Sequence, residues 1–379
     1  MTDQPNPSIA GLLVRPLAIA LLLGVFAPVA NAQSSTPLRA SAILEEDDAP
    51  APPRTPQNAA WAYYKAWDTI TTVEDRQKFG ELTTGRPDPG KPLTKAQRQI
   101  LEKHRVYLDG VIAATSMDTC DWGSRTDVGL GALIPHLGYM RQSARALALD
   151  ARRFAEDGNS VAAAERVVAL LRLSSHAATD HYLISTLVAA AIGHLAMSLT
   201  DELLKADQLT APAARMIVSA IRQVDTPDLY NTAAAIDLER RVTLDWFRKE
   251  CSGDNANIKF VRALSTSSSM RGESSRTRTP IALYLLTFSE QRIQAEIDRA
   301  DRYFDAVAAA WRKPHAAVAL DELETQVQEY QWGFVTQATM ASFSTVRRST
   351  DRTRETYQKS SAKLRAILEA QEAHGGAPK

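Results

Sequence analysis

The sequence predicts an all-α protein, an array of antiparallel helical hairpins with about nine helices behind a signal peptide. Apolar residues recur at the three-to-four spacing of a helix face in most segments after residue 58. No proline occurs between Pro135 and Pro212, and 15 alanines fall between Ala144 and Ala196, a composition that favours helices. The chain has 379 residues, of which 45% are hydrophobic, so it can bury a sizeable core.

The N-terminal segment has the pattern of an export signal. An apolar run from Leu17 to Ala27 lies between two prolines, and Ala30-Asn31-Ala32 supplies the small-x-small pattern that signal peptidase requires. We therefore expect residues 1–32 to be a signal peptide that is cleaved before Gln33, and the mature protein to be exported to the periplasm or the extracellular space. The alternative is an uncleaved membrane anchor, but the run is about half of the roughly 20 apolar residues that a spanning helix needs.

A disordered tether is expected over residues 33–57, where Ser, Pro, Ala and acidic residues dominate. A helical domain over residues 58–251 should follow. Asn58 can cap its first helix, and Thr94 can cap another that ends near Ser116. The expected core faces of these helices are Trp61, Tyr64, Trp67, Ile70, Ile100, Leu101, Leu108, Val111 and Ile112.

Two helices joined at Gly158 are predicted next, because glycine is the usual residue in a left-handed helix end and Ser160 can cap the helix that follows. This pair is weakly similar to a tetratricopeptide-type unit. No second copy follows at a 34-residue period, so a generic helical hairpin describes it better. The run from Tyr182 to Leu199 is apolar almost all round and should be the buried central helix of a bundle, with a membrane span as the alternative on length.

The last third is expected to contain a flexible loop and a hairpin. Residues 252–279 are rich in Ser and lack periodicity, which predicts a flexible loop. Residues 280–372 should form a long helical hairpin around Lys313-Pro314 that packs on the main domain, with Phe304 and Val327 buried between the facing helices.

Several short motifs resemble those of an uncharacterised group of exported or membrane-anchored, all-helical bacterial proteins. The resemblance covers about residues 57 to 200, and it implies a helical fold and an export route without a known activity. The motifs that carry it are Cys120-Asp-Trp-Gly123, Leu133-Ile-Pro-His-Leu137, Leu149-Asp-Ala151 and Leu183-Ile-Ser-Thr-Leu-Val188.

Two cysteines, Cys120 and Cys251, would both enter an oxidising compartment. A disulfide between them and two independent buried thiols are about equally supported, because pairing cannot be deduced from sequence. Zinc is disfavoured, since neither cysteine has another cysteine or a histidine at ligand spacing.

Only one cluster of histidines occurs, and its geometry does not favour a metal. On a continuous helix His181 would point roughly 140° away from His176, so a structural role is expected, with Asp180 as the cap of a helix that starts at His181. No cofactor motif is present.

Trp122, His136 and Arg141 are the candidates for a small-molecule cleft at a junction between loop and helix. The simpler interpretation is that Trp122 packs in the core while His136 and Arg141 satisfy backbone or carboxylate partners.

The charge balance excludes a global attraction to nucleic acid, because 44 basic residues offset 44 acidic ones. Membrane association would come only from an uncleaved N-terminal segment. The leading expectation is a non-enzymatic interaction or scaffolding protein of the periplasm or cell envelope with a protein partner, because helical hairpin arrays offer binding faces and catalytic signatures are missing. The alternative is an envelope enzyme whose site is assembled from dispersed residues near Trp122, His136 and Arg141.

Overall fold

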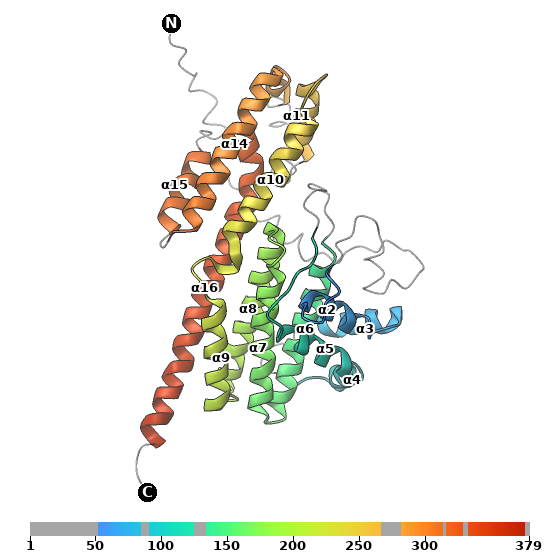
Figure 1. The fold of residues 1–379 in the computed structure, drawn as a ribbon. Coiled ribbons are helices and arrows are strands. Elements are labelled where there is room, and N and C mark those ends of the chain that lie inside the picture. Colours follow the sequence, from blue (N-terminus) through green and yellow to red (C-terminus); the bar gives the residue numbers. More distant parts are fainter. Residues whose placement is uncertain are drawn as a thin grey trace.

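A computed structural model describes residues 52–84, 91–124, 134–266, 282–313, 316–328 and 333–375. Within these ranges the chain is all-helical, with thirteen α-helices, one 3-10 helix and a short helical turn at residues 282–285 (Figure 1). The expectation of an all-α protein is confirmed for the described residues, but the chain forms more helices than the roughly nine expected. The predicted signal peptide and most of the predicted tether lie outside the described residues.

The first part of the chain forms two packed groups of helices. α6, α7, α8 and α9 are long and lie side by side, and the shorter α2 to α5 cover one side of α6 and α7 (Figure 1). The helices are α2 (Ala59–Trp67), α3 (Val73–Thr84), α4 (Lys95–Lys103), α5 (Arg105–Thr115), α6 (His136–Glu156), α7 (Ser160–Ala177), α8 (Leu183–Lys205) and α9 (Ala211–Val224).

Local caps explain several of these boundaries. Asn58 caps α2 with its side-chain oxygen, and Thr94 forms a reciprocal capping box with Gln97 at the start of α4. Gly158 has the expected left-handed conformation, with φ +77°, between α6 and α7. Asn159 rather than Ser160 caps α7, because its side chain accepts the hydrogen bond from the Ala162 amide.

α8 is the central helix that its composition predicts. Two thirds of its most apolar window is buried in the protein, where it packs against α7, α6 and α16. α8 is also the one helix among the described residues whose length and composition would allow it to cross a membrane. Its burial explains the apolar composition without a membrane.

The second part of the chain follows the short helix η4 (Leu229–Asn231). α10 packs along α14, and α11 and α15 flank this pair (Figure 1). The helices are α10 (Thr232–Glu250), α11 (Ala256–Thr266), α14 (Glu290–Trp311), α15 (Ala316–Gln328) and α16 (Gly333–Gly375).

Two expectations about this part need correction. Ala256–Thr266 forms α11 rather than flexible loop, because Phe260, Ala263 and Leu264 recur at helical spacing and are buried on one face; residues 267–279 lie outside the described residues. The second half of the predicted hairpin is divided into α15 and α16. Phe304 and Val327 are both buried, as predicted.

α16 joins the two parts of the protein. Its first half packs against α14 and α15, and its second half packs against α8 and α9, so that it runs along most of the molecule (Figure 1). Of its side chains, Tyr357 and Leu364 belong to the larger hydrophobic core, which α2 to α9 build, while Val346 belongs to the smaller core around α10, α11 and α14. The candidate site lies where these two cores meet.

Candidate functional site

The loop that carries Trp122 is tied to the start of α2. The side chain of Asn58 accepts a hydrogen bond of 2.8 Å from the Asp121 amide and donates one of 2.9 Å to the Asp121 carbonyl. The Ala59 amide adds a bond of 2.8 Å to the carbonyl of Thr119. Asn58 therefore serves both as a helix cap and as the clamp that fixes this loop.

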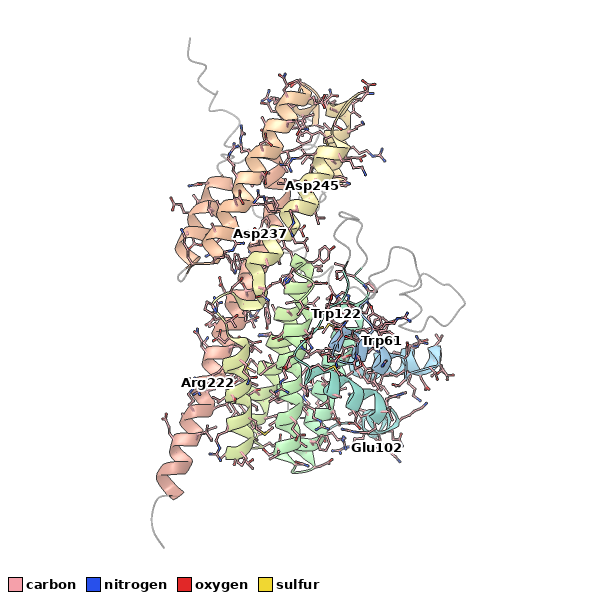
Figure 2. All side chains as sticks on the ribbon, in the orientation of Figure 1. Trp61, Glu102, Trp122, Arg222, Asp237 and Asp245 are labelled. Carbon is pink, nitrogen blue, oxygen red and sulfur yellow. The ribbon has the colours of Figure 1, made fainter. Side chains whose placement is uncertain are left out.

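Trp122 is buried among aromatic rings near the centre of the molecule (Figure 2). Its ring stacks on the imidazole of His136, with centroids 4.1 Å apart and an interplanar angle of 6°. Its indole N–H donates a bond of 2.9 Å to the carbonyl of His176, and Trp67 stacks nearly parallel at 6.1 Å. These contacts fix the orientation of the indole.

A buried histidine and carboxylate lie behind Trp122. Nε2 of His136 lies 3.1 Å from Oδ2 of Asp180, and neither side chain has exposed surface. The other Asp180 oxygen accepts from the Tyr182 amide at 3.3 Å. The expectation that Asp180 caps a helix starting at His181 is wrong, because His181 has φ +59° and α8 starts only at Leu183.

His176 also has a structural environment. Its Nδ1 lies 2.9 Å from the hydroxyl of Tyr63, and burial lowers its pKa to about 4, so the imidazole is neutral at physiological pH. Among the described residues no group of three or more His, Cys, Asp or Glu side chains could hold a metal ion.

A cavity of about 360 Å³ opens beside Trp122, between the loop, the turn from α7 to α8, and α10. This volume lies within the usual range for small-molecule sites. Its lining residues come from three separate segments: Asp121, Trp122 and Ser124; Thr179, Asp180 and His181; and Ala234, Asp237, Leu238 and Arg241.

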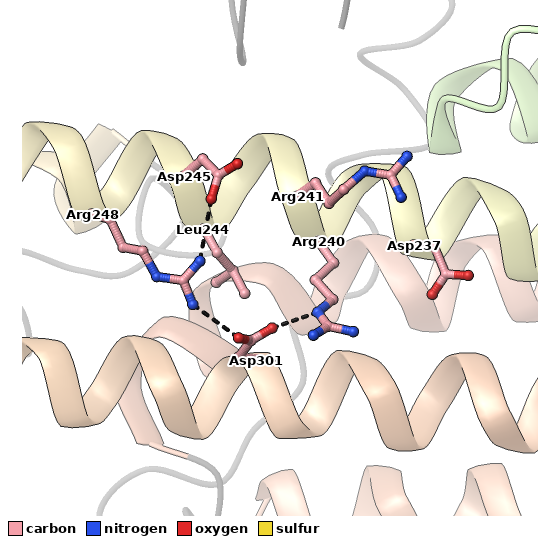
Figure 3. A pocket seen from close by; sticks show the side chains of 7 residues that line it. All are labelled: Asp237, Arg240, Arg241, Leu244, Asp245, Arg248 and Asp301. Carbon is pink, nitrogen blue, oxygen red and sulfur yellow. Dashed lines mark hydrogen bonds and ion pairs between the residues drawn. The ribbon is translucent and has the colours of Figure 1, made fainter. Parts of the chain in front are cut away.

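A second cavity of about 350 Å³ continues along α10 and shares Asp237 and Arg241 with the first. Figure 3 shows that Asp301 of α14 lies between Arg240 and Arg248 of α10 and interacts with both. These charges are paired within the protein, so the second cavity is an ion-paired interface between two helices.

The structure brings two of the three predicted cleft residues together. Trp122 lines the cavity and His136 lies directly behind it, whereas Arg141 lines neither cavity. Five residues on a helix correspond to a rotation of about 140° beyond a full turn, so Arg141 faces away from His136 on α6.

The sequence does not predict that the other residues around the cavity beside Trp122 belong to a site. Asp121 lies inside one of the recognised motifs, but Asp237 and Arg241 are two ordinary charged residues of an amphipathic helix in the sequence. Only the packing of α10 against the turn from α7 to α8 brings them to the site.

The two cysteines are free thiols in the structure and lie in different hydrophobic cores. Cys120 packs near His176, and Cys251 ends α10. Burial raises the pKa of Cys120 to about 12 and that of Cys251 to about 11, so both are protonated at neutral pH. The structure therefore gives no support to the disulfide.

No protein-family model, curated protein or solved structure matches the chain. The resemblance to exported helical proteins stays an expectation from the motifs alone.

Proposed function

We propose that the protein is a non-enzymatic binding protein of the bacterial periplasm or cell envelope, and that its ligand occupies the cavity beside Trp122. The observation that carries this proposal is the assembly of one polar cavity from three distant segments, two of which are held in place by long-range side-chain contacts. Asn58 clamps one wall, and the contact between His136 and Asp180 fixes another. Sites with convergent polar groups on a rigid frame are typical of ligand binding.

An envelope enzyme is the second candidate, and the buried pair of His136 and Asp180 favours it. A general base must reach a proton of its substrate. Here both side chains are fully buried, and the indole of Trp122 covers one face of the imidazole. The pair is therefore better placed to orient Trp122 than to react, which supports binding over catalysis.

A cavity-blocking variant tests the proposal. Ala234 lines the cavity and is half-buried, so Ala234→Phe should fill the space without removing a charge. Ser219→Phe places the same ring on an exposed position of α9 and serves as the control. Purified mature protein is incubated with periplasmic extract and washed, and the retained molecules are identified by mass spectrometry.

We expect at least one molecule to be retained by the wild type and by Ser219→Phe but lost from Ala234→Phe. If all three proteins retain the same molecules, the cavity is not the binding site. Circular dichroism of each variant establishes that it has folded.

A further inference from the structure

The charged side chains around the cavity differ in whether the protein itself neutralises them. Asp180 is engaged by His136 and by the Tyr182 amide. Asp237 forms an ion pair with Arg312, the residue that follows the end of α14. Neither carboxylate has to find a partner in a ligand.

Among the described residues, no side chain forms an ion pair with Arg241. It is exposed on α10, one turn from Asp237 and one turn from Asp245. Asp237 pairs instead with Arg312, and Asp245 with Arg248. The guanidinium of Arg241 is thus the cation at this site whose five donors are open to a ligand.

Asp121 is an acidic residue of the loop that carries Trp122, and it lines the same cavity as Arg241. One of its oxygens accepts a hydrogen bond of 2.8 Å from the Gly123 amide, and within the part of the chain that the structure describes no cation pairs with it. No salt bridge within 4.0 Å joins it to Arg241, so the two opposite charges face one cavity without neutralising each other.

We propose that the cavity binds a zwitterion that carries a free carboxylate and a free ammonium group, such as an amino acid or a short peptide with unblocked ends. Arg241 holds the carboxylate through a bidentate ion pair, and Asp121 accepts from the ammonium group. Trp122 lines the same cavity and supplies an apolar contact. This ligand class rests on the function proposed above, and it is chosen because one ligand then satisfies both unpaired charges.

Isothermal titration calorimetry with dialanine and its blocked forms tests the ligand class. Wild-type protein should bind dialanine at least about tenfold more tightly than N-acetyl-dialanine or dialanine amide, since each blocked form loses one charge-assisted contact. Arg241→Ala should bind dialanine and its amide equally. Asp121→Asn, which keeps the oxygen that accepts from Gly123, should bind dialanine and its N-acetyl form equally.

Arg222→Ala is the matched control, because Arg222 is an exposed arginine of α9 that lies away from the cavity (Figure 2). It should leave all affinities at the wild-type values. Equal binding of all three probes by the wild type, or binding of none, overturns the ligand class. The proposed function survives that result if Ala234→Phe still loses a molecule retained from the extract; if it loses none, both proposals fail.

Discussion

Replacement of Gly193 by alanine should disrupt the contact that holds α16 on α8. Gly193 is buried in α8 where the hydroxyls of Tyr230 and Tyr357 meet at 2.6 Å. A Cβ atom at this position would lie 2.3 Å from each hydroxyl oxygen, which is far inside van der Waals contact. Tyr357 is fully buried, so it cannot move away without opening the contact between the helices.

The expected cost follows from three contributions. Overpacking of a dense core costs about 1 to 3 kcal/mol. Separating the two buried hydroxyls costs about 1 to 3 kcal/mol more, because their bond of 2.6 Å is lost and Tyr230 keeps only the longer bond of 3.4 Å to the Ser174 hydroxyl. Alanine in a helix returns about 1 kcal/mol relative to glycine. The net loss in the free energy of unfolding is therefore about 1 to 5 kcal/mol.

Urea denaturation measures this loss against a matched glycine. Gly138 is an exposed position of α6, and a Cβ there would meet nothing within 4 Å. Gly138→Ala should stabilise the protein by about 0.5 to 1 kcal/mol. Adding Tyr357→Phe to Gly193→Ala removes one clashing oxygen and should recover part of the loss in a double-mutant cycle. If both glycine variants stabilise the protein equally, the packing of α16 on α8 is refuted.

Three further results are expected. Phe304→Ala should lower the free energy of unfolding by about 3 to 5 kcal/mol, because the ring is fully buried. Asp305→Ala should lower it by less than about 1 kcal/mol, because Asp305 only forms a surface ion pair. Equal denaturation midpoints of the two variants would contradict the burial of Phe304. Alkylation under denaturing conditions without reductant should label both Cys120 and Cys251, and a linked peptide in the digest would show a bridge instead. His176 has a folded-state pKa of about 4, against 6.5 for the free group, so the unfolded chain binds a proton at a higher pH than the folded protein does. The free energy of unfolding should therefore fall by about 3 kcal/mol as the pH drops from 6.5 to 4. His176→Gln should reduce this pH dependence, and an unchanged pH dependence would refute the assignment.

The sequence predicts those features of the fold that depend on neighbouring residues. Asn58, Thr94 and Gly158 act at helix ends through contacts within a few residues, so their roles are readable from local spacing. The apolar composition of α8 likewise predicts burial, because a helix that is apolar all round must be covered.

Helix boundaries that depend on contacts with distant residues are not predicted by the local sequence. The apolar spacing of the predicted hairpin does not show that α15 has Gln328 as its last residue and that α16 begins at Gly333. Gly333 takes φ +81°, and the carboxylate of Glu296 on α14 accepts from the Phe334 amide at 2.7 Å, which starts α16. That acceptor lies 38 residues away in the chain, so no local pattern shows it.

The candidate site is predicted only in part for the same reason. Trp122 and His136 lie within one motif-rich segment, and their proximity in sequence suggests a junction. Asp180 joins them because α6 and the turn after α7 are neighbours in space. Arg241 comes from a helix about 120 residues beyond Trp122, and only the tertiary structure brings it to the cavity.

The indole N–H resonance of Trp122 provides the most direct test of the cavity as the ligand site. The chain has six tryptophans, and the spectrum of a Trp122→Phe variant identifies the signal in a nitrogen–proton correlation experiment. Titration with dialanine should shift the Trp122 signal and leave that of Trp61, which lines neither cavity, unchanged. A saturable shift confined to other tryptophans, with Trp122 unmoved, would contradict a ligand site in this cavity.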